Sequence, residues 1–166
     1  MNDIFTIPDN PYYDRYDSDK CTTRILGYPG RVYQAQEVTE AQTMLTDYIS
    51  RLGNSILSDG NIIEGCKLQV VNNVATVNPG YIFLQGLVRK LVKAQSIKIK
   101  GSGEETIGVV IQRKVVTAED DSTYLDPITT LSNYGNPGAD RLVEELVIVL
   151  DDPNAVTMYA LKDGKI

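Results

Sequence analysis

Acidic side chains supply the few groups in this sequence that could carry out chemistry. Glu119, Asp120, Asp121 and Asp126 gather in one polar stretch, and hard carboxylate oxygens of this kind can hold calcium in a loop. Their spacing is not that of an EF-hand, so a solvated acidic loop is the favoured interpretation. A glycosidase needs two carboxylates at a defined separation, and the sequence singles out no such pair.

Other chemistry has little support in the residue types. The chain contains no histidine, which is the commonest general base and a common metal ligand. The glycine-rich run 101–103 precedes two glutamates, whereas a phosphate-binding loop needs a lysine and a helix, so we interpret it as a hairpin turn. Cys21 and Cys66 form neither a CxxC pair nor a disulfide framework. We therefore expect no enzymatic activity, no cofactor and no bound metal.

The charge and the composition indicate contact surfaces rather than nucleic-acid binding. The net charge is −6, and the basic footprint that nucleic acids require is not visible. The basic residues of the run 89–100 have strand spacing and are expected to project mostly to solvent, with an anion or glycan site as the alternative. We expect no signal peptide and no membrane insertion, because the first residues lack the basic and apolar regions of a leader and no apolar run approaches a membrane span. The ten tyrosines suit half-wet interfaces, where the ring is buried and the hydroxyl is bonded.

Residues 1–34 are expected to form an extended docking arm. Pro8, Pro11 and Pro29 interrupt any helix, and the tyrosine- and aspartate-rich run 12–17 has neither a strand nor a helix period. Such an arm cannot build its own core, so it is either disordered or laid over another surface. Its aromatic and apolar side chains favour the second alternative, and the candidate docking residues are Tyr12, Tyr13, Tyr16, Ile25, Leu26, Tyr28 and Tyr33.

Residues 35–58 are expected to contain one amphipathic helix. Its start lies between Gln36 and Thr39, where Thr39 could form a capping box with Gln42, and it should end at Gly53. Apolar residues recur at spacings of three and four, which is the a/d pattern of a coiled coil. These seam residues are Val38, Ala41, Leu45, Tyr48 and Leu52, and Ile49 and Ile56 widen the seam.

The spacing leaves two interpretations of this seam open. The helix could cover one sheet of its own chain, or it could pack against symmetry mates around an axis. The seam lasts under three heptads and reaches Ser55 at the next d position, whereas heptad evidence by itself needs about three or four repeats.

Residues 59–166 are expected to form a β-rich domain. Asn72-Asn73 predicts a tight hairpin, because asparagine tolerates positive φ, and Gly108 predicts a bulge in a long strand. The expected strands cover 68–71, 74–77, 81–92 as a pair or one bent strand, 96–100, 106–116, 142–150 and 156–161, with a polar loop at 118–141. This spacing indicates an antiparallel sandwich or barrel. The expected fold is therefore mainly β with one amphipathic helix behind an extended N-terminal arm.

Several blocks of the sequence carry a family resemblance. They are Tyr12-Tyr13-Asp14-Arg15-Tyr16, the run 29–38, Asp59-Gly60, Tyr124-Leu125-Asp126-Pro127, the run 133–142 and the last residues 159–166. Together they resemble an uncharacterised "domain of unknown function" family that occurs in bacteriophage tail-fibre and baseplate proteins, notably of cyanophages. Family members usually continue well beyond this point, so we expect the N-terminal part of a longer polypeptide. The family has no established catalytic residues, and none are carried over.

The resemblance implies a structural role in the virion. N-terminal domains of phage fibres generally attach to the tail and are generally trimeric. It thus implies an attachment module that docks on other tail or baseplate proteins, forms a homotrimer, and enters the virion after synthesis in the host cytoplasm. The alternative is a receptor- or glycan-binding β-domain of a phage appendage, with exposed aromatic residues on loops of the β-rich domain. Most tyrosines lie before residue 49, which favours the attachment module.

Overall fold

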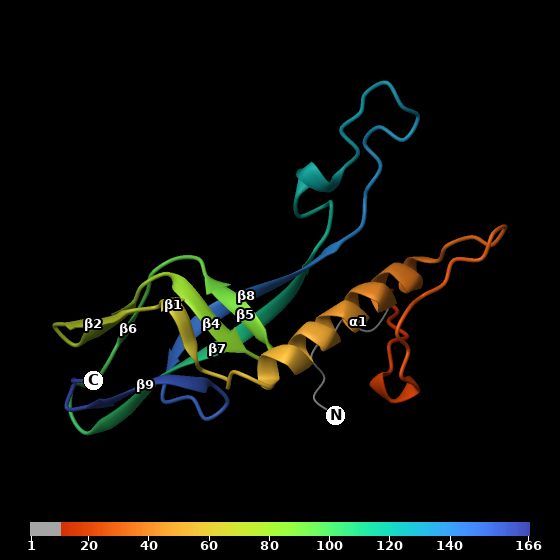
Figure 1. The fold of residues 1–166 in the computed structure, drawn as a ribbon. Helices are drawn as coiled ribbons and strands as arrows, with labels where there is room; N and C mark the ends of the chain where they lie inside the picture. Colours follow the sequence, from red (N-terminus) through yellow and green to blue (C-terminus); the bar gives the residue numbers. More distant parts are fainter. Residues whose placement is uncertain (1–10) are drawn as a thin grey trace. The chain divides into compact units, whose positions relative to one another are not determined.

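The computed structural model describes residues 11–166, which are mainly β with one α-helix (Figure 1). The elements are the short 3-10 helix η1 (Ser18–Lys20), the helix α1 (Ala35–Asn54), the strands β1 (Ile62–Gly65), β2 (Leu68–Val71), β3 (Val74–Val77), β4 (Gly80–Leu84), β5 (Leu87–Leu91), β6 (Gln95–Lys98) and β7 (Glu104–Val116), the 3-10 helix η2 (Ser122–Tyr124), and the strands β8 (Arg141–Leu150) and β9 (Val156–Lys162). The strands form three three-stranded sheets, in the orders β1-β4-β5, β2-β3-β6 and β8-β7-β9. The expected mainly β fold with one amphipathic helix and antiparallel sheets is confirmed.

The described chain divides into two units. The first contains residues 11–65 and 81–89, and therefore the arm, α1 and most of the sheet β1-β4-β5. The second contains residues 66–80 and 90–166, with the sheets β2-β3-β6 and β8-β7-β9.

The helix α1 begins slightly earlier than the sequence pattern suggested. Gln34 is the N-cap residue, and its backbone N–H donates to the Glu37 carboxylate at 3.0 Å. This is the backbone half of a capping box, and it moves the start to Ala35 instead of the range beginning at Gln36. The helix ends at Asn54, one residue beyond the expected Gly53.

Small residues bring the end of α1 close to the β4–β5 turn in the first unit. Gly53 lies against Phe83, whose ring carbon Cε2 would be 2.7 Å from an added Cβ. Ser50 is buried, and a side chain at Gly86 would overlap its Oγ. Gly86 has a φ of +78°, which only glycine adopts without strain. These contacts hold the helix on the hairpin through its small residues.

The strands of the first unit include one that the sequence did not reveal. The turn residues Gln85 and Gly86 both have positive φ, so the run 81–92 forms two strands rather than one bent strand. The unexpected strand is β1, and all four of its residues are exposed. An exposed strand carries no alternation of apolar and polar residues, and this explains why the pattern missed it.

The second unit is built around the long strand β7. It pairs with β8 from Ile107↔Leu150 to Val116↔Arg141, and its pairing with β9 shifts register between Ile107 and Gly108. The extra residue at this shift is Met158 of β9, so the bulge expected in β7 at Gly108 lies opposite Gly108 in the neighbouring strand instead. The Asn72-Asn73 hairpin is confirmed, because both asparagines have positive φ and Val71 pairs with Val74.

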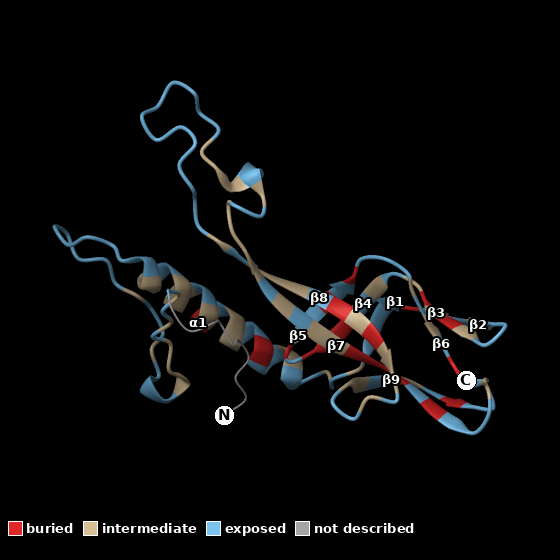
Figure 2. Ribbon diagram, turned by 180° about the vertical axis from the view of Figure 1, so that it is seen from behind, coloured by how far each residue is buried: buried red, intermediate tan, exposed pale blue. Residues whose placement is uncertain are grey.

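Side-chain hydrogen bonds connect the two sheets of the second unit. The Gln95 amide on β6 donates to the Leu146 carbonyl at 2.6 Å and accepts from the Ile148 N–H at 2.9 Å. The Tyr159 hydroxyl donates to the Cys66 carbonyl at 2.7 Å. Figure 2 shows buried residues, in red, on strands of this unit, and its core includes Ala75, Val77, Ile99, Ile107, Val109, Leu146, Ile148 and Leu161. The turn 101–103 joins β6 to β7, which lie in different sheets, so the expected hairpin at this point is wrong.

Candidate interaction surface

The first part of the arm contacts α1 of its own chain, and in Figure 1 the orange part that follows projects beyond the N-terminal end of the helix. The Tyr16 hydroxyl donates to the Asp47 carboxylate at 2.6 Å, and the Thr43 hydroxyl donates to Asp14. The Tyr48 hydroxyl donates to the Thr22 carbonyl at 3.2 Å. Residues 14–22 of the arm therefore lie over α1, and the docking of the arm on another protein stays a prediction.

Asp47 is the electrostatic centre of this contact. Its carboxylate also binds Arg51 at 2.6 Å on the next turn of the helix. The hydrogen bond to Asp47, followed by burial, raises the pKa of Tyr16 to about 12, because ionised tyrosine would face a carboxylate. The hydrogen bond to Asp47 likewise raises the pKa of Arg51.

The Tyr16–Asp47 bond should make the arm sensitive to high pH. The pKa of Tyr16 is above the ordinary tyrosine value of 10, so this bond adds stability below pH 10 and is lost as the pH rises toward 12. We expect the tyrosinate absorbance of the wild type minus that of Tyr16→Phe to titrate near pH 12. A difference spectrum that titrates at pH 10 would contradict this contact.

Some candidate docking residues of the arm are half-buried and the others are exposed. Tyr12, Tyr16 and Ile25 are half-buried. The other four are exposed: Tyr13, Leu26, Tyr28 and Tyr33. A turn at Pro29-Gly30, closed by the Arg31 N–H on the Tyr28 carbonyl at 3.1 Å, places the Arg31 guanidinium 4.5 Å from the centre of the Tyr28 ring. Val32 is exposed beside this turn, although it fits no period that would single it out in the sequence.

The apolar stripe of α1 faces outward. Val38, Leu45 and Leu52 are 53%, 60% and 66% exposed. Ala41 is half-buried, and Tyr48 is 39% exposed. The buried residues of the helix are instead Met44 and Ser50. Described residues of this chain thus contact α1 mainly on the side that carries its polar and small residues. The seam predicted from the sequence remains largely at the surface.

A comparison with family models matches residues 10–166 to the family described as "Domain of unknown function (DUF4815)". The chain belongs to the DUF4815 family. No curated protein and no solved structure matches the chain significantly. The prediction of a domain-of-unknown-function family is confirmed, while the phage setting stays a prediction.

The acidic stretch of this DUF4815 chain stabilises its own loop. Asp120 accepts from the Thr117 N–H at 2.9 Å, which lowers the pKa of its carboxyl. Asp121 caps η2 by accepting from Thr123, which lowers its pKa as well. Asp126 accepts from the Ile128 N–H at 2.8 Å. Within residues 11–166, no three acidic, cysteine or histidine side chains are grouped so that they could hold a metal ion.

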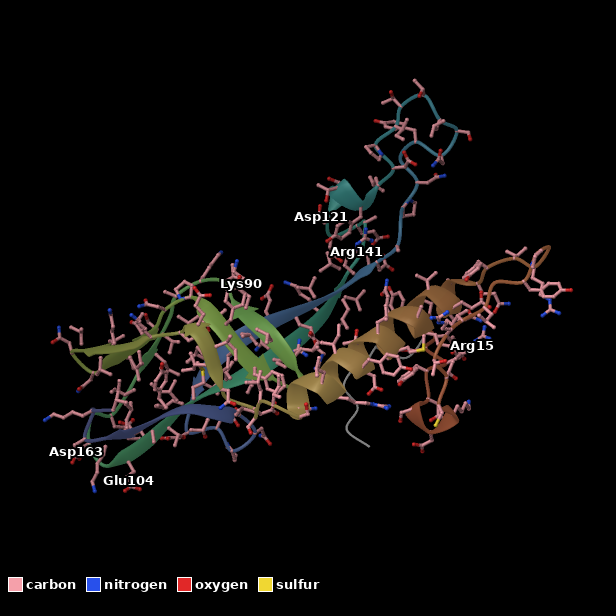
Figure 3. The ribbon with its side chains drawn as sticks, in the orientation of Figure 1. Arg15, Lys90, Glu104, Asp121, Arg141 and Asp163 are labelled. Carbon is pink, nitrogen blue, oxygen red and sulfur yellow. The ribbon has the colours of Figure 1, made fainter. Side chains whose placement is uncertain are left out.

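The loop between β7 and β8 is ordered by local hydrogen bonds. The Asp126 N–H donates to the Asn136 carbonyl at 2.9 Å, and the Gly138 N–H donates to the Tyr124 carbonyl at 2.9 Å. The Arg141 guanidinium lies 4.4 Å from the centre of the Tyr124 ring at the base of this loop, where Figure 3 labels Arg141 and Asp121. Ile128, Leu131 and Tyr134 are exposed toward its end. The loop is thus a second surface with apolar side chains.

The basic residues expected to project mostly to solvent are mostly exposed. Lys90, Lys93, Lys98 and Lys100 are exposed, as predicted. Arg89 is the buried exception, and its Nε donates to the Leu84 carbonyl at 3.1 Å. Within residues 11–166, no helix is both long and apolar enough to cross a membrane.

Proposed function

We propose that this DUF4815 chain is a structural virion protein. In this proposal it is an attachment module of a phage tail fibre or baseplate component, which docks on neighbouring tail proteins and assembles as an oligomer, with three copies in the form that the resemblance implies. The observation that carries the proposal is the outward apolar surface of the first unit, on both the arm and α1. The phage setting is supported by the sequence resemblance alone.

The exposed apolar side chains of the arm and of α1 all lie in the first unit. Monomeric proteins rarely leave large contiguous apolar patches in water, and such patches mark interaction sites. Burial of apolar area stabilises a complex by about 25 cal/mol per Å² before the costs of association. The exposed tyrosines of the arm add rings whose hydroxyls can remain hydrated at an interface. Several copies of one weak contact would bind with high avidity.

Virions of the phage that encodes the chain provide the test. We expect the wild-type chain to be present in purified particles, with label from an antibody against it at the tail. The double variant Leu26→Ser/Tyr28→Ser should reduce incorporation at least tenfold, because both side chains are exposed on the arm. The matched control is Tyr134→Ser, which is similarly exposed but lies on the β7–β8 loop. Particles that contain no copy of the chain would contradict the proposal.

The alternative function is receptor or glycan binding by the β-rich domain. The observation that favours it is the exposure of Ile128, Leu131 and Tyr134 on the β7–β8 loop. In the same experiment, this alternative predicts that Tyr134→Ser particles contain the chain at wild-type level but no longer adsorb to host cells. Normal adsorption of these particles favours the attachment module.

A further inference from the structure

The exposed side of α1 contains a regular seam of its own. Its six residues are spaced four, three, four, three and four apart, and all of them are exposed: Val38, Gln42, Leu45, Ile49, Leu52 and Ile56. We refer to these six residues as the outer seam. Ile56 lies two residues beyond the end of the helix. Compared with the seam expected from the sequence, the outer seam is rotated away from Ala41 and Tyr48 toward Ile49 and Ile56.

Most contacts within the chain come from the other side of the helix, and two come from positions that flank the outer seam, Tyr48 and Gly53. Thr43 and Asp47 bind the arm, and Ser50 and Gly53 receive the β4–β5 turn. Figure 2 shows α1 with exposed residues, in pale blue, over much of its length. The outer seam is therefore available to a partner in the described structure.

The charge of α1 indicates which partner fits. The charged residues of the helix are Glu37, Glu40, Asp47 and Arg51. With about 100° of rotation per residue, each of them lies about 100° or more from the centre of the outer seam. The flanking positions are Thr39, Thr46 and Gly53 on one side and Ala41, Tyr48 and Ser55 on the other. None of these flanking positions is charged. Two copies of this face can therefore meet without bringing like charges together.

The polar residue of the outer seam indicates the relative direction of the helices. In an antiparallel pair centred on the seam, Gln42 would face Leu52, and a buried amide without a partner is unfavourable. In a parallel pair, Gln42 faces Gln42 of the other copy, and the two amides can bond to each other. Gln42, Ile49 and Ile56 then occupy a positions, and Val38, Leu45 and Leu52 occupy d positions. Isoleucine at a with leucine at d is typical of parallel two-stranded coiled coils, so the pattern supports the parallel direction but not the three copies that the resemblance implies.

We propose that the outer seam is a parallel interface between copies of this chain, in the register Val38 to Val38, Gln42 to Gln42 and Ile49 to Ile49. The inference rests on the proposed function for the existence of an oligomer, and it adds the partner, the direction and the register. A single polar layer at Gln42 would fix that register, because a shift along the seam places the amide against an apolar layer.

Cysteine cross-linking of the full chain tests the direction and the register. The background carries Cys21→Ser, because Cys21 is exposed, and keeps Cys66, which is buried. Under mild oxidation, Val38→Cys should form a disulfide-linked pair of chains on a non-reducing gel. The matched control Glu40→Cys lies on the opposite side of the helix and should remain unlinked. Linkage in a mixture of Val38→Cys and Ile56→Cys chains, with none in Val38→Cys alone, would show antiparallel helices and overturn the proposal.

A mass measurement by light scattering provides a second, independent test. The wild type should have two or three times the chain mass of 18.3 kDa, and Leu45→Asp/Leu52→Asp should fall to a single chain mass. Both leucines are exposed, so the far-ultraviolet circular dichroism should be unchanged. A wild type with the mass of one chain at high concentration would overturn the proposal.

The two proposals fail in different ways. Val38→Cys linkage in a chain that is absent from virions would refute the proposed function and leave the interface in place. Virions that contain the chain, together with a Val38→Cys variant that does not link, would refute the interface alone.

Discussion

Gly86→Ala is expected to destabilise the first unit by about 2 to 5 kcal/mol. The φ of Gly86 is +78°, and an L-residue in this region costs about 1–2 kcal/mol. The new Cβ would also overlap the Ser50 Oγ and lie 2.7 Å from the Ser50 Cβ and 3.2 Å from its Cα. Ser50 is buried on α1, so the helix itself must shift, and overpacking of this kind adds about 1–3 kcal/mol.

Gly103→Ala is the matched control for this prediction. Gly103 has almost the same φ, +77°, but no heavy atom lies within 4 Å of an added Cβ. Only the backbone cost of about 1–2 kcal/mol remains. Urea unfolding followed by far-ultraviolet circular dichroism would measure both variants. Equal losses of unfolding free energy in the two variants would show that Ser50 of α1 does not pack against the β4–β5 turn in solution.

Glu105→Ala is expected to cost about 3 to 5 kcal/mol in the second unit. Glu105 is 1% exposed, and its two carboxylate oxygens accept from the Lys100 N–H at 2.7 Å and the Gly101 N–H at 3.0 Å. Hydrogen bonds to a charged group contribute about 1.5–3 kcal/mol each, and their loss leaves two part-buried donors unsatisfied. The turn between β6 and β7 should therefore open.

Two neighbouring variants separate this role from a general effect of charge. Glu104→Ala removes an exposed carboxylate one residue away and should change the free energy of unfolding by less than about 0.5 kcal/mol. Glu105→Gln keeps one acceptor oxygen and should lie between the two. Chemical denaturation of the three variants would measure their free energies of unfolding. A Glu105→Ala variant as stable as Glu104→Ala would show that the Glu105 carboxylate does not hold the β6–β7 turn. The two neighbouring glutamates cannot be told apart from the sequence, because only the fold decides which of them turns inward.

The elements that depend on local chemistry could be predicted from the sequence. Asn72 and Asn73 specify a tight turn by their tolerance of positive φ. Gly108 marks the place along β7 where the neighbouring strand β9 bulges, and an added Cβ there would lie 2.6 Å from the Ala155 Cβ. The spacing of apolar residues indicated an amphipathic helix in residues 35–58, and this helix is α1. Each of these features is encoded within a few neighbouring residues.

The environment of those elements was decided only by the tertiary structure. Periodicity shows that α1 has an apolar face, but it does not say whether this face turns to its own chain or to a partner. The answer comes from contacts between residues distant in sequence: Tyr16 with Asp47, and Ser50 with Gly86. Small and polar side chains make these contacts, so the spacing of hydrophobic residues cannot predict them. The apolar face is consequently left exposed, and the interaction surface became visible only once the chain was folded.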